Sequence, residues 1–165
     1  MRILMIAAAA ALALSPVAAS AIPVKGKTAP AFSLPTTDPS GKRKVTLSAL
    51  RGKPVYINFF ASWCGPCNDE APAIALLKER YKKAGLQVIG VDYLEEAGRG
   101  ADFQKKHLNP YTVVAVDTSG VVSRNFGVIA LPVHVFIGPD GKVRVFRPGE
   151  MSPAEIEAAI KTTLH

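Results

Sequence analysis

The sequence predicts an α/β fold, and three observations lead to this prediction. Short apolar runs alternate along the chain with segments of helical periodicity, as in folds whose strands are followed by helices. No internal repeat interrupts this order. The only two cysteines, Cys64 and Cys67, are separated by two residues and lie where an apolar run meets a helical segment. We therefore expect a sheet with a cysteine pair at the carboxyl end of one strand.

The central part of the chain supplies most of the predicted sheet. The run VYINFF is typical of a buried strand and leads directly toward Cys64. The elements expected here are a strand over 55–60, a helix from 64 to about 83, a strand over 86–93, a helix over 100–108 and a strand over 112–116. Alternation of strands and helices is the order found in α/β proteins.

Two hairpins and two further helices complete the prediction. A short helix is expected over 119–127, before a hairpin over 133–146 with its turn at residues 140–141. Residues 22–53 form an N-terminal extension packed on the sheet, with a small hairpin made by AFSL and KVTL. The sequence SPAE starts the last helix, with Ser152 as N-cap and Glu155 closing a capping box.

The N-terminus has the pattern of a secretory signal. Arg2 is followed by an apolar run over 3–14, then by Pro16 and the small residues VAASA. This pattern predicts a signal peptide over residues 1–21, cleaved after Ala21. An uncleaved membrane anchor is the alternative, but the run is shorter than the roughly 20 residues that span a bilayer. We expect the mature chain to work in the periplasm or elsewhere outside the cytoplasm.

Residues 22–165 suit one domain of ordinary size, with 19 basic and 13 acidic residues and a formal charge of +6. Seven of the basic residues lie within 22–53, where Asp38 is the only acid. This stretch is typical of a solvated face. It carries neither interleaved aromatic residues nor a nucleic-acid motif, so we expect no nucleic-acid partner.

The cysteine pair could be a structural staple, half of a metal site or a reactive dithiol. Closing so small a loop stabilises a fold by only about 2 kcal/mol in the chain-entropy model. A structural zinc site usually needs four ligands, and His107, His134 and His165 have no ligand spacing. At a strand-to-helix junction, free backbone N–H groups and the helix dipole favour a thiolate. This predicts Cys64 as the exposed nucleophile and Cys67 as its shielded resolving partner.

Further motifs surround the cysteines. WCGPC follows NFFAS and precedes NDEAP, so that Cys64, Cys67, Glu70 and Pro72 match C-x-x-C-x-x-E-x-P. An AP-x-F-x-L entry, L-x-x-L-x-GK-P and G-x-x-x-LP before VFIGPDGKV extend the match from about Ala29 to the last helix. The chain resembles the thioredoxin superfamily, and especially its exported TlpA/ResA-type, CcmG/DsbE-related thiol:disulfide oxidoreductases. The resemblance implies a thioredoxin-like fold, in which helices flank a central mixed β-sheet. It also implies an N-terminal extension and an extra helix–strand insertion. It implies no cofactor or metal.

The resemblance also implies a surface that binds the partner protein. Pro132 matches the cis-proline of the family, which faces the dithiol, and with Leu131 it would pair through the backbone with a bound partner. The residues expected around the dithiol are Trp63, Pro66, Ala130, Leu131 and Gly149. Trp63 could instead belong to the core, but its place beside the nucleophile favours half exposure.

The acid that exchanges a proton with the second thiol is expected at a different position from that of thioredoxin. Asn58 stands where thioredoxin has a buried acid, six residues before the first cysteine. The TlpA/ResA resemblance implies a glutamate beyond the following strand, and Glu95 has that place. Asp92 and Glu96 are the alternatives, because catalytic groups gather at the carboxyl ends of strands in open sheets.

The direction of electron flow is predicted from the two residues between the cysteines. Gly65 and Pro66 add no donor that would strongly stabilise a thiolate, which favours a reductant over an oxidant. The resemblance implies exported clients with a disulfide, such as apocytochrome c or an oxidase copper-site protein, and a membrane electron donor of the DsbD/CcdA kind. The acid that follows the cis-proline in the cytochrome c branch is Val133 here. We expect a monomer.

Two other functions compete with this interpretation. A copper-delivery module would use Cys64, Cys67 and His134 as ligands, although VHVFI is typical of a packed strand. A peroxidase of the peroxiredoxin kind shares the N-terminal pattern, but its active-site cysteine follows a threonine three residues earlier. This chain has Ala61 at that position.

Overall fold

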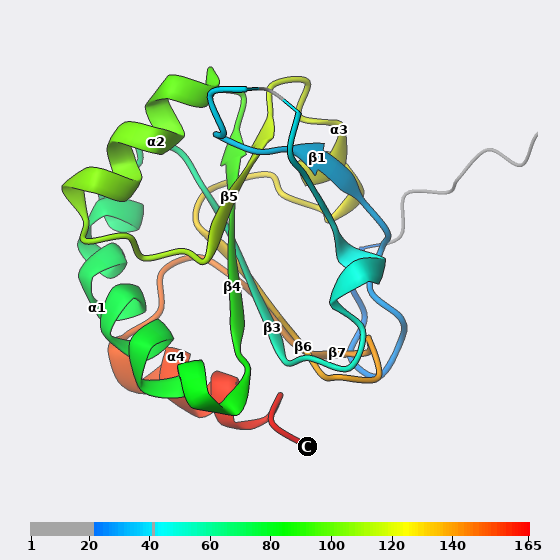
Figure 1. Cartoon of the computed structure of the whole chain (residues 1–165). Coiled ribbons are helices and arrows are strands. Elements are labelled where there is room, and N and C mark those ends of the chain that lie inside the picture. Colours follow the sequence, from blue (N-terminus) through cyan, green and yellow to red (C-terminus); the bar gives the residue numbers. More distant parts are fainter. Residues whose placement is uncertain (1–21, 41) are drawn as a thin grey trace, which may run out of the picture.

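A five-stranded mixed sheet forms the centre of the molecule, with the strand order β5-β4-β3-β6-β7 (Figure 1). The computed structural model describes residues 22–40 and 42–165, so the predicted signal over 1–21 lies outside the described residues. The strands are β3 (Val55–Phe60), β4 (Gln87–Tyr93), β5 (Val113–Asp117), β6 (Val133–Ile137) and β7 (Val143–Pro148). β4 pairs in parallel with β3 and β5, whereas β6 is antiparallel to β3 and β7. The predicted mixed sheet is confirmed.

Helices cover both faces of the sheet (Figure 1). They are α1 (Gly65–Tyr81), α2 (Ala97–Lys106), α3 (Val121–Asn125) and α4 (Pro153–Lys161). Successive side chains of a strand point to opposite faces, so β3 contributes to two cores. Tyr56 and Phe60 pack in the cluster that contains residues of α1, α2 and α4, and Ile57 and Phe59 pack in the cluster beneath the N-terminal extension. The cysteines belong to the first cluster.

The N-terminal extension packs on the second face, as expected. β1 (Ser33–Pro35) and β2 (Lys44–Thr46) form the predicted antiparallel pair. The extension is tied to the sheet by an isolated bridge from Thr36 to Ala115 of β5, and to the hairpin turn by a second bridge from Thr28 to Lys142. A short 3-10 helix, η1 (Leu47–Leu50), leads from β2 toward β3. It was not predicted.

The helix–strand insertion is formed by α2 and β5, and α2 begins three residues earlier than expected. Gly98 and Gly100 weaken the helical signal of its first turn, because glycine is a poor helix former. Gly100 is needed for packing, since a Cβ there would lie 2.6 Å from Oδ2 of Asp92.

The hairpin of β6 and β7 and the capping box of Ser152 and Glu155 are confirmed. None of the helices in the described ranges has the length and the apolarity needed to cross a membrane.

Candidate active site

The cysteine pair lies at the amino end of α1, shortly after β3. Cys64 is the N-cap residue, with an extended backbone, and Pro66 stands in the first turn. The Cys64 Sγ accepts a hydrogen bond from the backbone N–H of Cys67, with a sulfur–nitrogen distance of 3.3 Å. A thiolate on Cys64 is stabilised here, because this N–H group and the helix dipole both point toward it. The predicted strand-to-helix junction is confirmed.

The two cysteines form a disulfide, with their Cα atoms 5.3 Å apart. Cys64 is 5% exposed and Cys67 is 1% exposed. The prediction that Cys64 is exposed is therefore wrong for this oxidised form. Its sulfur is bonded to Cys67, and the residue packs in the apolar cluster of the first face. Cys64 is still the more accessible of the two cysteines, as predicted, and its role as the nucleophile stays a prediction.

The sequence placed Trp63 and the loop around Pro132 beside the dithiol. Trp63 is 68% exposed, and Leu131 packs against the cluster that contains both cysteines. The Leu131–Pro132 peptide bond is cis, as predicted. The carbonyl of Pro132 accepts a hydrogen bond of 2.9 Å from the N–H of Gly149, which brings Gly149 to this loop. The exposed members of the predicted partner surface are Trp63, Pro66, Ala130 and Gly149.

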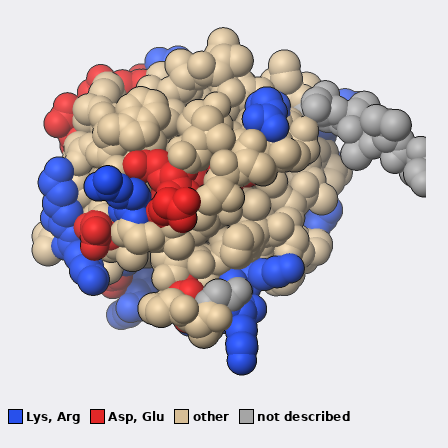
Figure 2. All heavy atoms as spheres, turned by 90° about the horizontal axis from the view of Figure 1, so that it is seen from above, with Lys and Arg blue, Asp and Glu red and all other residues tan. Residues whose placement is uncertain are grey.

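One exposed residue of this surface was missed. Ile129 is 97% exposed and immediately precedes the Ala130–Pro132 segment. The signal available in the sequence was the apolar run VIAL before Pro132, between the predicted short helix and the predicted hairpin. Figure 2 looks onto this end of the molecule and shows a broad uncharged area, with acidic side chains beside it and basic side chains toward the edge.

The backbone before Cys64 is held by side chains from two elements. Glu95, which follows β4, accepts a hydrogen bond from the Ser62 N–H at 2.5 Å and another from the Ser62 hydroxyl at 2.6 Å. Asn68 of α1 donates to the carbonyls of Ser62 and Cys64, at 3.0 and 2.8 Å. Glu95 is thus joined to the segment that carries the nucleophile. Both of its oxygens are engaged by Ser62, and its role in proton exchange stays a prediction.

A buried carboxyl group, that of Glu70, lies on α1 one turn after Cys67. Burial raises its pKa to about 7, and the charge of Glu150 adds to this effect, while the Met151 N–H that it accepts opposes it. The residue belongs to the motif that carried the resemblance, but sequence reasoning gave it no role. The available signal was its spacing, because residues i and i+3 share one face of a helix.

Asp92 is a second buried carboxyl group, at the carboxyl end of β4. Its pKa is raised to about 8, first by burial and then by the neighbouring Glu95, while the Gly100 N–H opposes the shift. Neither of its oxygens has a partner at full hydrogen-bonding geometry among the residues that the structure describes. Glu96, the other alternative to Glu95, is exposed.

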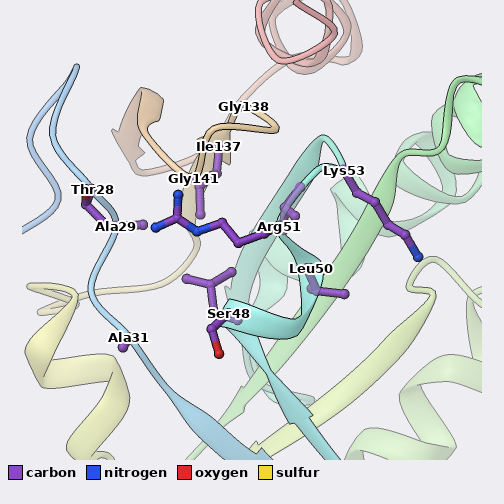
Figure 3. A pocket seen from close by; sticks show the side chains of 12 residues that line it. Thr28, Ala29, Ala31, Ser48, Leu50, Arg51, Lys53, Ile137, Gly138 and Gly141 are labelled. Atoms are coloured by element: carbon purple, nitrogen blue, oxygen red, sulfur yellow. The ribbon is translucent and has the colours of Figure 1, made fainter.

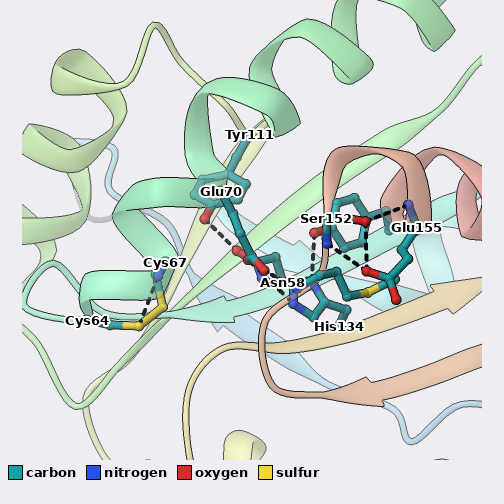
Figure 4. A network of polar contacts seen from close by, with 10 residues as sticks. Asn58, Cys64, Cys67, Glu70, Tyr111, His134, Ser152 and Glu155 are labelled. Carbon is teal, nitrogen blue, oxygen red and sulfur yellow. Dashed lines mark hydrogen bonds and ion pairs between the residues drawn. A yellow bond between two sulfur atoms is a disulfide. The ribbon is translucent and has the colours of Figure 1, made fainter.

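Asn58 belongs to a buried polar network behind the dithiol (Figure 4). Its Oδ1 accepts a hydrogen bond of 2.6 Å from the Tyr111 hydroxyl, and its Nδ2 lies 3.3 Å from Nδ1 of His134. The Tyr56 hydroxyl lies 2.8 Å from the same nitrogen. The other ring nitrogen of His134 lies 3.5 Å from Oε2 of Glu70. Asn58 is thus connected to the carboxyl group of Glu70 through His134, and it adds no charge to the network.

The three copper ligands considered above do not form a metal site. In the described ranges, no group of three or more His, Cys, Asp or Glu side chains is placed to hold a metal ion. Cys64 and Cys67 are bonded to each other, and both nitrogens of His134 face other side chains.

A small pocket of about 90 Å³ lies far from the cysteines (Figure 3). Its lining includes Val55 at the amino end of β3, whereas Cys64 follows the carboxyl end of that strand. Gly138 and Gly141 of the β6–β7 turn also line it, together with the side chain of Arg51. Because the two places are at opposite ends of the sheet, this pocket is not part of the dithiol site.

A disulfide that caps a helix after the central strand, opposite a cis-proline loop, defines a thiol:disulfide exchange protein with a thioredoxin-like fold. The chain belongs to the AhpC/TSA family, whose model matches residues 25–146. Within that family it belongs with the thiol:disulfide oxidoreductases that its sequence relatives are named for. The resemblance inferred from the motifs is confirmed.

Two relatives illustrate this kinship. The thiol-disulfide oxidoreductase ResA of Bacillus thuringiensis is 36% identical over 136 residues, which are 82% of this chain and 76% of the relative. The thiol:disulfide interchange protein DsbE of Pseudomonas fluorescens is 34% identical over 72% of this chain and 64% of its own length. Among solved structures, a putative DsbE from Chlorobium tepidum superposes with a TM-score of 0.76 at 32% identity. It covers 87% of this chain and 99% of that one. The predicted thioredoxin-like fold is confirmed.

Proposed function

We propose that this chain reduces disulfide bonds in exported client proteins outside the cytoplasm. The observation that carries the proposal is the place of Cys64, whose sulfur accepts the Cys67 N–H at the start of α1. This favours a thiolate, the nucleophile of disulfide exchange. Gly65 and Pro66 add no side-chain donor that would strongly stabilise the reduced form, and a modestly stabilised dithiol is a reductant.

The reaction consists of two disulfide exchanges. The Cys64 thiolate attacks one sulfur of the client disulfide, forms a mixed disulfide and releases the first client thiolate. Cys67 then loses its proton, attacks the Cys64 sulfur and releases the second client thiolate. The client gains two electrons, and the dithiol becomes the Cys64–Cys67 disulfide seen here. A second dithiol must reduce it again.

A nearby carboxyl group takes the proton of Cys67, and the structure favours Glu70 for this role. It lies one turn beyond Cys67, is buried, and has a pKa raised to about 7. A base with a pKa near the working pH transfers protons efficiently. Glu95 remains the competing candidate from the sequence. Its hydrogen bonds to Ser62 suit a group that holds the backbone before Cys64.

The client docks on the uncharged surface around the disulfide. Its exposed residues are Trp63, Pro66, Ile129, Ala130 and Gly149, and the half-buried Leu131 and the buried Pro132 lie beside them in sequence. Leu131 pairs with the client backbone beside the cis bond, whereas the carbonyl of Pro132 already accepts the Gly149 N–H. In this proposal the signal over residues 1–21 directs export. The clients are apocytochrome c or an oxidase copper-site protein, and a membrane donor of the DsbD/CcdA kind reduces the disulfide again. The protein acts as a monomer.

Trapping tests the roles of the two sulfurs. Cys67→Ser protein should accumulate mixed disulfides through Cys64, because the resolving attack is lost, whereas Cys64→Ser protein should not. Equal trapping by the two variants would overturn the assignment. Mass spectrometry of the trapped proteins then names the clients.

The redox potential tests the direction of electron flow. It should lie nearer thioredoxin's roughly −270 mV than the roughly −120 mV of a strong oxidant such as DsbA. A potential above about −180 mV would contradict a reducing role. Stoichiometric copper binding or rapid peroxide turnover by the same preparation would support the two competing functions instead.

A further inference from the structure

His134 is a fully buried histidine in β6, next to β3 and opposite Glu70 of α1. Burial lowers the pKa of its ring to about 4; the nearby Gly149 backbone opposes this effect and the charge of Arg147 adds to it. At neutral pH the ring is therefore uncharged. A neutral imidazole has one N–H donor and one acceptor nitrogen, and its neighbours decide which nitrogen carries the proton.

Two groups that can donate a hydrogen bond lie beside Nδ1. The Tyr56 hydroxyl lies 2.8 Å from Nδ1, and the amide nitrogen of Asn58 lies 3.3 Å from it. The orientation of the Asn58 amide is held by Tyr111, whose hydroxyl donates to the other end of the amide at 2.6 Å. An amide NH₂ group can only donate. Nδ1 must then accept, which places the ring proton on Nε2.

The Nε2 atom faces Glu70. It lies 3.5 Å from Oε2 of the carboxyl group, while Oε1 accepts the Met151 N–H. Neither Oε2 nor Nε2 has a partner at full hydrogen-bonding geometry among residues 22–40 and 42–165, so the two buried atoms face each other as a close polar pair. Figure 4 shows the Glu70 side chain directed from α1 toward the ring of His134. The ring nitrogen assigned the proton thus lies 3.5 Å from the carboxyl oxygen of Glu70 that has no full hydrogen bond in the described ranges.

We propose that His134 is a positioning residue for disulfide exchange, held by Tyr56 and Asn58 as the Nε2–H tautomer so that it donates toward Glu70. The donor orients the carboxyl group and stabilises its charged form, in which it accepts the proton of Cys67. This proposal rests on the assignment of proton exchange to Glu70. It explains why the sheet carries Asn58 rather than an acid, because a carboxylate there would not fix the tautomer by donating to Nδ1.

Other ionisable groups also act on this pair. Tyr56 and Tyr111 are neutral, because burial raises their pKa values well above the usual one. The charge of Glu150 raises the pKa of Glu70, and the charge of Arg147 lowers that of His134. None of these groups donates to Oε2 of Glu70 in the structure, so the effect of His134 can be separated from theirs.

The tautomer can be measured directly on the wild-type protein. Long-range ¹H–¹⁵N NMR spectra distinguish a protonated from an unprotonated ring nitrogen. From pH 5 to pH 8, His134 should show a protonated Nε2 and an unprotonated Nδ1. A proton on Nδ1, or a charged ring above pH 6, would overturn the proposal. This measurement requires no substitution and no activity.

Two variants of similar size form a matched pair. The side-chain nitrogen of glutamine reaches about the position of Nε2, and that of asparagine about the position of Nδ1. His134→Asn should therefore leave Oε2 of Glu70 without a donor and raise the pKa of Glu70, because hydrogen bonding to the charged form is lost. We expect an upward shift of about one pH unit, read by ¹³C NMR of the carboxyl group and by the pH profile of mixed-disulfide resolution. His134→Gln should restore most of the wild-type profile.

The outcomes separate this proposal from the proposed function. If both variants shift the Glu70 titration equally, or neither does, His134 does not act through its Nε2–H group. If His134→Asn shifts the titration while Glu70→Gln resolves mixed disulfides at the wild-type rate, the contact exists but Glu70 is not the proton acceptor. Urea unfolding of the two variants should give similar midpoints, which removes general destabilisation as the cause.

Discussion

Glu70 and Asp92 are two buried carboxyl groups near the dithiol segment, and their surroundings differ. The Glu70 carboxyl accepts the Met151 N–H at Oε1, and its Oε2 lies 3.5 Å from Nε2 of His134 without a full hydrogen bond. Asp92 has no partner at full hydrogen-bonding geometry in the described ranges and lies beside Glu95. Burial is the largest cause of the raised pKa in both, which is about 7 for Glu70 and about 8 for Asp92.

The difference shows that burial alone does not make a carboxyl group suitable for proton exchange. Glu70 accepts the Met151 N–H, which stabilises its charged form, and its pKa of about 7 makes both protonation states accessible near pH 7. Asp92 has the higher pKa and is protonated at neutral pH. Its neighbour Glu95 holds Ser62, two residues before Cys64. We therefore infer that Glu70 exchanges protons, whereas Asp92 lies beside Glu95, which supports the backbone before the nucleophile.

The largest effect is expected from Glu70→Gln. The variant keeps an oxygen for the Met151 N–H but cannot take a proton from Cys67, so resolution of the mixed disulfide should slow by about 10²- to 10⁴-fold at pH 7. Stopped-flow measurement of resolution checks this. The control is Asp69→Asn, an exposed neighbour on α1. If Glu95→Gln lost this much rate and Glu70→Gln did not, the assignment from the sequence would be right and ours wrong.

An intermediate effect is expected on the pH dependence of stability. The pKa of Asp92 is about 8 in the folded state, against the usual 3.8. Between these values the folded state binds the additional proton, so the free energy of unfolding falls as pH rises. Asp92→Asn removes this titration, and the loss of stability between pH 5 and pH 9 should shrink by a few kcal/mol.

Urea unfolding at several pH values measures the effect of Asp92→Asn. The exposed Asp102→Asn serves as the control and should leave the pH slope unchanged. Glu70 should still contribute a smaller fall in the free energy of unfolding as pH rises, because its pKa is raised from the usual 4.5 to about 7. A wild-type slope in Asp92→Asn would show that the buried carboxyl group does not take up the additional proton on folding.

The smallest effect is expected from Glu95→Gln, if its role is to hold Ser62. The amide keeps one oxygen as acceptor but turns an NH₂ group toward the other Ser62 donor. Loss of one hydrogen bond to a charged group should cost about 1–2 kcal/mol of stability and slow the initial Cys64 attack by up to about tenfold. The exposed Glu96→Gln is the matched control. A loss confined to the resolution step would speak for direct proton exchange by Glu95.

The sequence alone determined the order of strands and helices, the place of the cysteines at the start of α1 and the capping box of α4. These features depend on apolar periodicity and on short motifs, which are local in the chain. The family resemblance added the cis-proline and the helix–strand insertion. The start of α2 was misplaced, because Gly98 and Gly100 weaken the helical signal of its first turn. Gly100 is required by its packing against Asp92.

Only the tertiary structure decided which carboxyl groups are buried and what they contact. Glu95 meets Ser62 across 33 residues of sequence, and Glu70 meets Met151 across 81. No local pattern encodes such contacts, because they arise when separate strands and helices pack together. The same holds for the burial of Cys64 and for the donors around His134. Because pKa values follow from desolvation and from neighbouring charges and donors, the acid that serves the dithiol could be inferred only after the fold was known.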